Sequence, residues 1–153
     1  MMHDILSQQA VVASMQATTK KEVLQELGRL ASAATGQDAM AIFNALWERE
    51  RLGTTGVGHG IAIPHGRLAN LDRVHGFFVR LPQPIDFDSI DNGPVDLVFL
   101  LLAPAGAGAD HLQALASVSR LLRDQKLCQK LRSAKDANAL FQLLTGTPDS
   151  KAA

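Results

Sequence analysis

The sequence contains little cysteine, no excess of charge of either sign and no long apolar segment. Cys128 is the only cysteine, which rules out an internal disulfide and favours a reducing compartment. The 15 basic and 15 acidic residues cancel, and no cluster of lysine and arginine offers the phosphate contacts that a nucleic-acid partner needs. The longest apolar run, 97–103, is far shorter than the ~20 residues of a membrane-spanning helix, and the N-terminus lacks the basic and apolar regions of a signal peptide. We therefore expect a cytoplasmic protein that neither inserts into a membrane nor binds nucleic acid.

Length and composition favour one globular domain. The chain has 153 residues, and 46% of them are hydrophobic, which is enough to build a buried core in a domain of ordinary size. We predict a single domain over 1–153, with its core at 5–145 and a frayed tail at 146–153. Cys128 lies in a helical pattern and is interpreted as a structural thiol.

The first part of the chain is typical of two helices. Apolar residues recur at helical spacing over 18–35, where Thr19 and Glu22 form a capping-box signature. A second helix is expected to begin near Asp38 and to end at Gly53. Its inner side is predicted to carry three large apolar residues, Phe43, Leu46 and Trp47.

The last part of the chain is also helical in pattern. Asp110 is the expected N-cap of a third helix, and shorter helices are expected at 126–133 and 136–144. The core stripe of the third helix is predicted to consist of Leu112, Leu115, Ala116, Leu121 and Leu122.

The middle of the chain predicts strands. Short runs rich in β-branched, aromatic and other apolar residues lie at 61–65, 74–81 and 95–103. Pro82 and Pro84 are expected to break the chain between strands, and 88–93 has the composition of a turn. Helices on either side of a block of strands predict an α/β domain, with a mixed β-sheet flanked by helices on both sides.

The most informative histidine lies in the segment GIAIPHGR, at 60–67. His65 follows Pro64, which restricts the backbone, and precedes Gly66, which leaves space beside the imidazole. A neutral imidazole is a nucleophile, and a phosphoryl group on its nitrogen can be passed on. These residues alone leave a functional and a structural role equally open.

Two further features suggest an anion near this segment. The glycine-rich loop before it would let backbone amides approach a phosphate, although a plain tight turn explains it as well or better; its glycines are Gly53, Gly56, Gly58 and Gly60. His111 lies in the first turn of the expected third helix, where an anion is favoured, but an exposed helix start is the simpler interpretation. His3 indicates no function, and His75 is interpreted as structural.

Three segments together resemble a known family. They are RERLGTTGVGHGIAIPHGR at 49–67, PIDFDSIDNGPVDLVFLLLAP at 84–104 and HLQALASVSRLL at 111–122. They are similar to the enzyme IIA domains of the bacterial phosphotransferase system, in the mannitol, fructose and nitrogen-regulatory group, and favour its nitrogen-regulatory branch. The resemblance spans almost the whole chain and implies the mannitol-type enzyme IIA fold.

The resemblance also implies a site and its partners. His65 would be the phosphoryl acceptor and become a tele-phosphohistidine, His111 would stabilise the phosphoryl group, and Arg49 would support it. The phosphoryl donor would be a small histidine-phosphorylated, HPr-like carrier protein. Regulatory target proteins would respond to the phosphorylation state, with Leu68 and Leu71 forming an apolar rim around His65. No cofactor and no metal ion are expected.

Two alternative functions remain open, and one residue departs from the family pattern. The chain could be a stand-alone fructose- or mannitol-type enzyme IIA that passes phosphate to a IIB domain. Three histidines, His59, His65 and His111, could instead hold a metal ion in an enzyme of another class. His59 also departs from the family pattern, in which asparagine often stands at this place, and could change the surroundings of His65.

Overall fold

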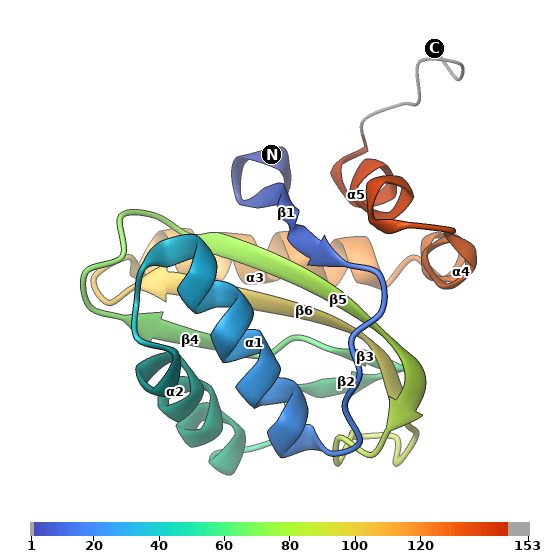
Figure 1. The fold of residues 1–153 in the computed structure, drawn as a ribbon, viewed down its shortest axis with the longest axis horizontal. Helices are drawn as coiled ribbons and strands as arrows, with labels where there is room; N and C mark the ends of the chain where they lie inside the picture. The colour runs from blue at the N-terminus through green and yellow to red at the C-terminus, as the bar shows by residue number, and fades with distance from the viewer. Residues whose placement is uncertain (1, 147–153) are drawn as a thin grey trace.

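The computed structural model describes residues 2–146, which contain one mixed sheet of six strands (Figure 1). The strands are β1 (Leu6–Val12), β2 (Gly56–Gly58), β3 (Ile61–Ala62), β4 (His65–Leu68), β5 (His75–Ile85) and β6 (Val95–Pro104). Strand β6 pairs antiparallel with β5 on one side and parallel with β3 and β4 on the other. Strand β1 extends the sheet beyond β5 in parallel, and β2 pairs antiparallel with β3.

The sheet is covered by helices on both faces, which confirms the predicted α/β class. The helical elements of the described residues are η1 (Met2–Asp4), α1 (Lys20–Thr35), α2 (Ala39–Arg51), α3 (Gly108–Leu122), α4 (Gln125–Ser133) and α5 (Ala137–Thr145). Figure 1 shows α1 and α2 in front of the sheet and α3 behind it. Within 2–146, none of the helices has the length and apolar character that a membrane crossing requires.

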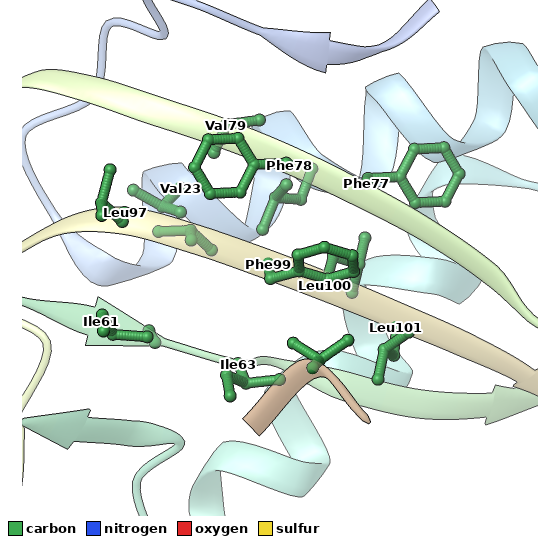
Figure 2. Packing of buried hydrophobic residues seen from close by; sticks show 14 of the residues in the cluster. Val23, Ile61, Ile63, Phe77, Phe78, Val79, Leu97, Phe99, Leu100 and Leu101 are labelled. Carbon is green, nitrogen blue, oxygen red and sulfur yellow. The ribbon is translucent and has the colours of Figure 1, made fainter. Parts of the chain in front are cut away.

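Strand β6 is central because its side chains are apolar on both faces. Every residue from Leu97 to Ala103 is buried, as expected for a strand covered by two helical layers. Phe78 of β5 and Phe99 of β6 meet edge to face, with ring centroids 6.2 Å apart, in the centre of this core (Figure 2). Fully burying a side chain of this kind contributes about 1.5–3 kcal/mol, so this pair anchors β5 to β6.

Strands β3 and β4 are two parts of one interrupted strand, and this arrangement positions His65. Ile61 pairs with Leu97 and His65 pairs with Leu101, so the register along β6 is the same on both sides of the interruption. Pro64 has no backbone N–H to donate, but its carbonyl oxygen accepts from the Leu101 amide at 3.0 Å. The strand predicted over 61–65 is therefore present but interrupted at 63–64, and His65 begins its second part.

Two strands were not predicted from the sequence, and two prolines were predicted at the wrong place. Strand β1 contains three consecutive exposed polar residues, so it lacks the alternation that reveals a half-buried strand. Strand β2 is short and lies within the glycine-rich loop. Pro82 and Pro84 lie inside β5 rather than between strands, in an exposed stretch where the pairing with β6 shifts register. A proline is tolerated there because no regular ladder hydrogen bond is required.

The predicted helix starts were correct for α1 and α2. The Thr19 hydroxyl accepts from the Glu22 amide at 3.1 Å, and the Asp38 carboxylate accepts from the Ala41 amide at 3.0 Å. Helix α2 ends at Arg51, two residues before Gly53. The expected helices at 126–133 and 136–144 match α4 and α5 to within one residue at each end. Of the predicted frayed tail at 146–153, residues 147–153 lie outside the described residues.

Two predictions about α3 were wrong. Asp110 is not its N-cap, because the helix begins at Gly108 after Ala107, whose side chain makes no capping bond. The predicted core stripe includes Leu112 and Ala116, but both are exposed. The residues that α3 buries are His111, Ala114, Val118 and Leu122.

The inner face of α2 also differs from the prediction. Leu46 is buried as expected, whereas Phe43 and Trp47 are half-buried and stack on each other with ring centroids 5.8 Å apart. The residues that this helix buries fully are Ile42, Leu46 and Glu50, at successive intervals of four.

Candidate functional site

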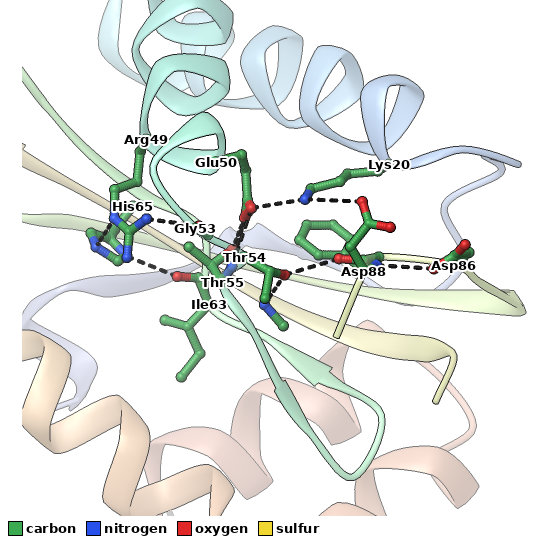
Figure 3. Close-up of polar contacts among 12 residues, drawn as sticks. Lys20, Arg49, Glu50, Gly53, Thr54, Thr55, Ile63, His65, Asp86 and Asp88 are labelled. Atoms are coloured by element: carbon green, nitrogen blue, oxygen red, sulfur yellow. Dashed lines mark hydrogen bonds and ion pairs between the residues drawn. The ribbon is translucent and has the colours of Figure 1, made fainter. Parts of the chain in front are cut away.

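One ring nitrogen of His65 is hydrogen-bonded to a backbone carbonyl, and the other carries the lone pair that can act as a nucleophile. Its Nδ1 lies 2.9 Å from the carbonyl oxygen of Ile63, and because a carbonyl only accepts, Nδ1 carries the proton. The lone pair is therefore on Nε2, which accepts from Nε of Arg49 at 3.1 Å (Figure 3). Burial lowers the pKa of His65, and the charge of Arg49 lowers it further. His65 is thus a neutral imidazole with a defined nucleophilic nitrogen.

Arg49 reaches this nitrogen from the last turn of α2. Besides its bond to His65, its Nη1 donates to the carbonyl oxygen of Gly53 at 2.8 Å. The guanidinium is consequently fixed between the helix, the following loop and the imidazole, with further N–H groups to offer.

A buried network behind Arg49 fixes the loop that follows α2. The Glu50 carboxylate, only 7% exposed, accepts from the Thr55 amide at 2.9 and 3.1 Å and from the Thr55 hydroxyl. Lys20 compensates its charge, with Nζ 3.1 Å from Glu50 and 3.6 Å from Asp88 (Figure 3). Neither Glu50 nor Thr55 was predicted from the sequence, although Glu50 continues the four-residue spacing of the buried face of α2.

His111 lies beside His65 and comes from the opposite helical layer. The two imidazole centroids are 5.5 Å apart, with the rings nearly perpendicular at 84°. The backbone N–H of His111 already donates to Ala107 at 2.9 Å, so its imidazole rather than its amide is available. Burial lowers the pKa of His111, and the proximity of the titratable His65 ring and the charge of Arg67 lower it further.

Arg67 is a second arginine at the site, and it was not predicted from the sequence. Its Nε makes a long hydrogen bond, 3.5 Å, to Nδ1 of His111. Nδ1 is then the accepting nitrogen of His111, and its Nε2 carries the proton. The signal was present in the sequence, because Arg67 lies two residues after His65 and therefore on the same side of strand β4.

These side chains line one groove of about 530 Å³ between α2 and α3. Arg49, His65, Arg67 and His111 provide its polar wall. Two apolar side chains, Leu52 at 85% and Leu112 at 65% exposed, also line it and project into solvent. The expected rim of Leu68 and Leu71 was wrong, because both pack against the hydrophobic core instead. The structure thus brings Arg49, His65 and His111 together beside an exposed apolar surface.

His59 and most of the glycine-rich loop lie elsewhere. Gly56 and Gly58 form strand β2, and a Cβ at Gly56 would come within 2.5 Å of the Ser89 hydroxyl oxygen, which favours the tight-turn interpretation. His59 has a left-handed backbone, with φ of 57°, a conformation that asparagine also adopts readily. It lines a second pocket away from His65 and His111. Within 2–146 no group of three or more His, Cys, Asp or Glu is arranged to hold a metal ion.

Comparison with known proteins identifies relatives over nearly the whole chain. The family described as "Phosphoenolpyruvate-dependent sugar phosphotransferase system, EIIA 2" matches residues 4–146. A nitrogen regulatory protein of Bradyrhizobium diazoefficiens is 52% identical over 149 residues, which are 97% of each chain.

Solved structures of related proteins also superpose on nearly the whole chain. The crystal structure of nitrogen regulatory protein IIA-Ntr from Neisseria meningitidis superposes with a TM-score of 0.87 at 33% identity, covering 92% of this chain and 97% of that one. Mannitol IIA from Escherichia coli superposes with a TM-score of 0.74 at 22% identity, covering 90% of this chain and 97% of that one. The second likeness concerns the fold alone, and it matches the mannitol-type fold that the sequence predicts.

Proposed function

The chain belongs to the EIIA 2 family of the phosphoenolpyruvate-dependent sugar phosphotransferase system, and on this premise we propose that it carries a phosphoryl group on Nε2 of His65. The observation that carries the proposal is the bond between Nδ1 of His65 and the Ile63 carbonyl oxygen, which leaves Nε2 as the nucleophile. The lowered pKa of His65 supports it, because only the neutral ring can attack phosphorus.

The proposed transfer is an in-line displacement between two imidazoles. The N–P bond of a donor phosphohistidine breaks as Nε2 of His65 forms a new N–P bond, and the electron pair of the broken bond stays on the donor ring. As the lone pair of Nε2 is consumed, the Arg49 N–H turns to a phosphoryl oxygen, and His111 donates from its own Nε2. The Ile63 carbonyl keeps the proton on Nδ1 of His65, which leaves the N–P bond ready for onward transfer. No metal ion or nucleotide is needed for these steps.

We place the protein in the nitrogen-regulatory branch, as a cytoplasmic phosphoryl carrier and regulator. The 52% identity to a nitrogen regulatory protein supports this branch. The donor would be a small HPr-like phosphocarrier protein that docks over the groove, where Leu52 and Leu112 offer apolar contact. Phosphorylation adds about −1.5 to −2 charges to this face, so a regulatory target that binds it would distinguish the two states.

A sugar-transport role is the second candidate, because the matching family is described as part of a sugar phosphotransferase system. In that case the phosphoryl group would move from His65 to a IIB domain, through the same groove. Transfer to a purified fructose- or mannitol-type IIB domain, compared with the effect on regulatory targets, separates the two roles.

The direct test is to incubate the protein with phosphoenolpyruvate, enzyme I and the phosphocarrier, and to map the labelled residue at neutral pH. Label is expected on His65 alone, and His65→Ala should abolish it. His75→Ala is the matched control, because His75 is a half-buried histidine paired with Asp72 away from the groove. Label that persists in His65→Ala would sink the assignment.

A further inference from the structure

A second pocket lies at the other end of α3 from His111. It is enclosed by the β2–β3 hairpin, the end of α3 and helix α4, and its volume is about 400 Å³. Small-molecule sites typically have about 300–1,000 Å³, with mostly apolar walls and a few polar groups. The apolar walls here are Val57, Ile61, Ile63, Leu122 and the Cys128 side chain. Burial raises the pKa of the Cys128 thiol, which therefore contributes a neutral surface.

The walls of this pocket are fixed by specific polar contacts. Arg132 of α4 forms a bidentate pair with Asp96, at 2.8 and 3.0 Å, and donates to the carbonyl oxygen of His59 at 2.9 Å. The amide of His59 in turn donates to the Asp91 carboxylate at 3.0 Å. The hairpin turn is thus tied to α4, and the pocket does not depend on a mobile side chain for its shape.

The charge around the pocket is positive and partly uncompensated. Asp96 neutralises Arg132, but Arg123, which also lines the pocket, has no side-chain partner among the described residues. No acidic side chain of the described residues lines the pocket. Gln125 and Gln129 also line the pocket and add amide groups that can accept or donate hydrogen bonds.

We propose that this pocket binds a small molecule with an apolar chain and a carboxylate headgroup, the chain lying on the apolar walls and the carboxylate at Arg123. The site is separate from the groove at His65 and does not depend on phosphoryl transfer. Charge complementarity selects an anion over a cation, and the apolar walls select a hydrocarbon chain over a small inorganic ion.

Octanoate is a suitable probe, titrated into the isotopically labelled protein and followed by amide NMR shifts. Saturable shifts are expected in the β2–β3 hairpin and in residues 119–132. Octylammonium, which has the same chain and the opposite charge, should bind at least about tenfold more weakly. Arg123→Ala should weaken octanoate binding about three- to fivefold. Arg120→Ala, an exposed arginine of the same helix outside the pocket, should leave it unchanged.

Two further variants make the result decisive. Ser119→Phe places a ring in the pocket and should remove binding; if this variant does not fold, Arg123→Ala decides the question. His65→Ala should bind octanoate as the wild type does, because the groove at His65 also combines arginines with apolar side chains and must be distinguished. The proposal is overturned if octylammonium binds as tightly as octanoate, if His65→Ala loses binding, if Arg123→Ala and Arg120→Ala behave alike, or if no saturable shifts occur.

Discussion

Replacing Arg49 by glutamine should slow phosphoryl transfer to His65 while leaving the protein folded. The side chain is half-buried at the end of α2 and touches the reacting nitrogen directly, at 3.1 Å. A hydrogen bond to a charged group typically contributes about 1.5–3 kcal/mol, which corresponds to a loss of roughly 10- to 150-fold in rate if the bond stabilises the transferring phosphoryl group.

The same substitution should change the titration of His65. Burial is the main reason why the pKa of His65 is low, and the Arg49 charge is a further one. Removing the charge should therefore raise the pKa of His65, so that a larger fraction of the ring is protonated and inactive at mildly acidic pH. The rate loss should accordingly be greater at pH 6 than at pH 8. The assay is single-turnover transfer from the phosphorylated carrier at both pH values, with an NMR titration of the His65 ring.

Two variants control for the general effect of charge on this helix. Arg51→Gln removes an exposed arginine that lies two residues after Arg49 and pairs with Glu48, and this variant should transfer at the wild-type rate. Arg49→Lys keeps the charge but not the planar fork that reaches both His65 and Gly53, so its rate should lie between those of Arg49→Gln and the wild type. A wild-type rate in Arg49→Gln, or an equal loss in Arg51→Gln, would refute the assigned role.

Four other outcomes are expected. His111→Ala should still accept phosphate but pass it on roughly 10- to 100-fold more slowly; a wild-type rate would leave His111 a structural role only. Glu50→Gln should lower the free energy of unfolding in urea by about 1–3 kcal/mol, because a buried carboxylate loses charge-assisted bonds, while exposed Glu48→Gln should change it by less than about 0.5 kcal/mol. Burial lowers the pKa of His65 and of His111, so the unfolded chain binds protons more readily and stability should fall as the pH drops from above about 6.5 through the folded pKa values. Asparagine at both positions should flatten this slope in urea unfolding, and an unchanged slope would assign the pH dependence to other groups. A regulatory target should bind the unmodified protein and His65→Ala about 5- to 150-fold more tightly than the phosphorylated protein; equal affinities in a pull-down or calorimetric titration would leave a carrier without a switch.

The sequence by itself determined the starts of α1 and α2 and the position of the central strand. Thr19 and Asp38 act on amides within three residues, so their capping role depends on no distant part of the chain. The run at 97–103 is apolar at every position, which is typical of a strand covered on both faces. The residues around His65 alone left its role open, and only the resemblance of three segments to a known family indicated the reacting histidine of the proposal.

The tertiary structure decided the elements and faces that local pattern leaves ambiguous. Strand β1 is recognisable only through its pairing with β5, nearly 70 residues later in the chain. Helix α3 has apolar residues on two sides, so periodicity favoured a stripe through Leu112, whereas packing against β6 selected the side of Ala114 and Val118. The choice between two apolar faces depends on the partner surface, and that surface is not encoded within the helix.

One part of the candidate site was determined by the local sequence and the other part by the tertiary structure. His65 and the Ile63 carbonyl that orients it are two residues apart, so the defined nucleophilic nitrogen follows from local chain geometry around Pro64. His111 lies 46 residues further on, and only the parallel pairing of β4 with β6, followed by the return of α3 behind the sheet, brings its ring within 5.5 Å. His59, in the turn between β2 and β3, lines a different pocket, although it is only six residues from His65. Proximity in the chain determines which groups can orient one another through the backbone, whereas the pairing of distant strands determines which side chains share a site.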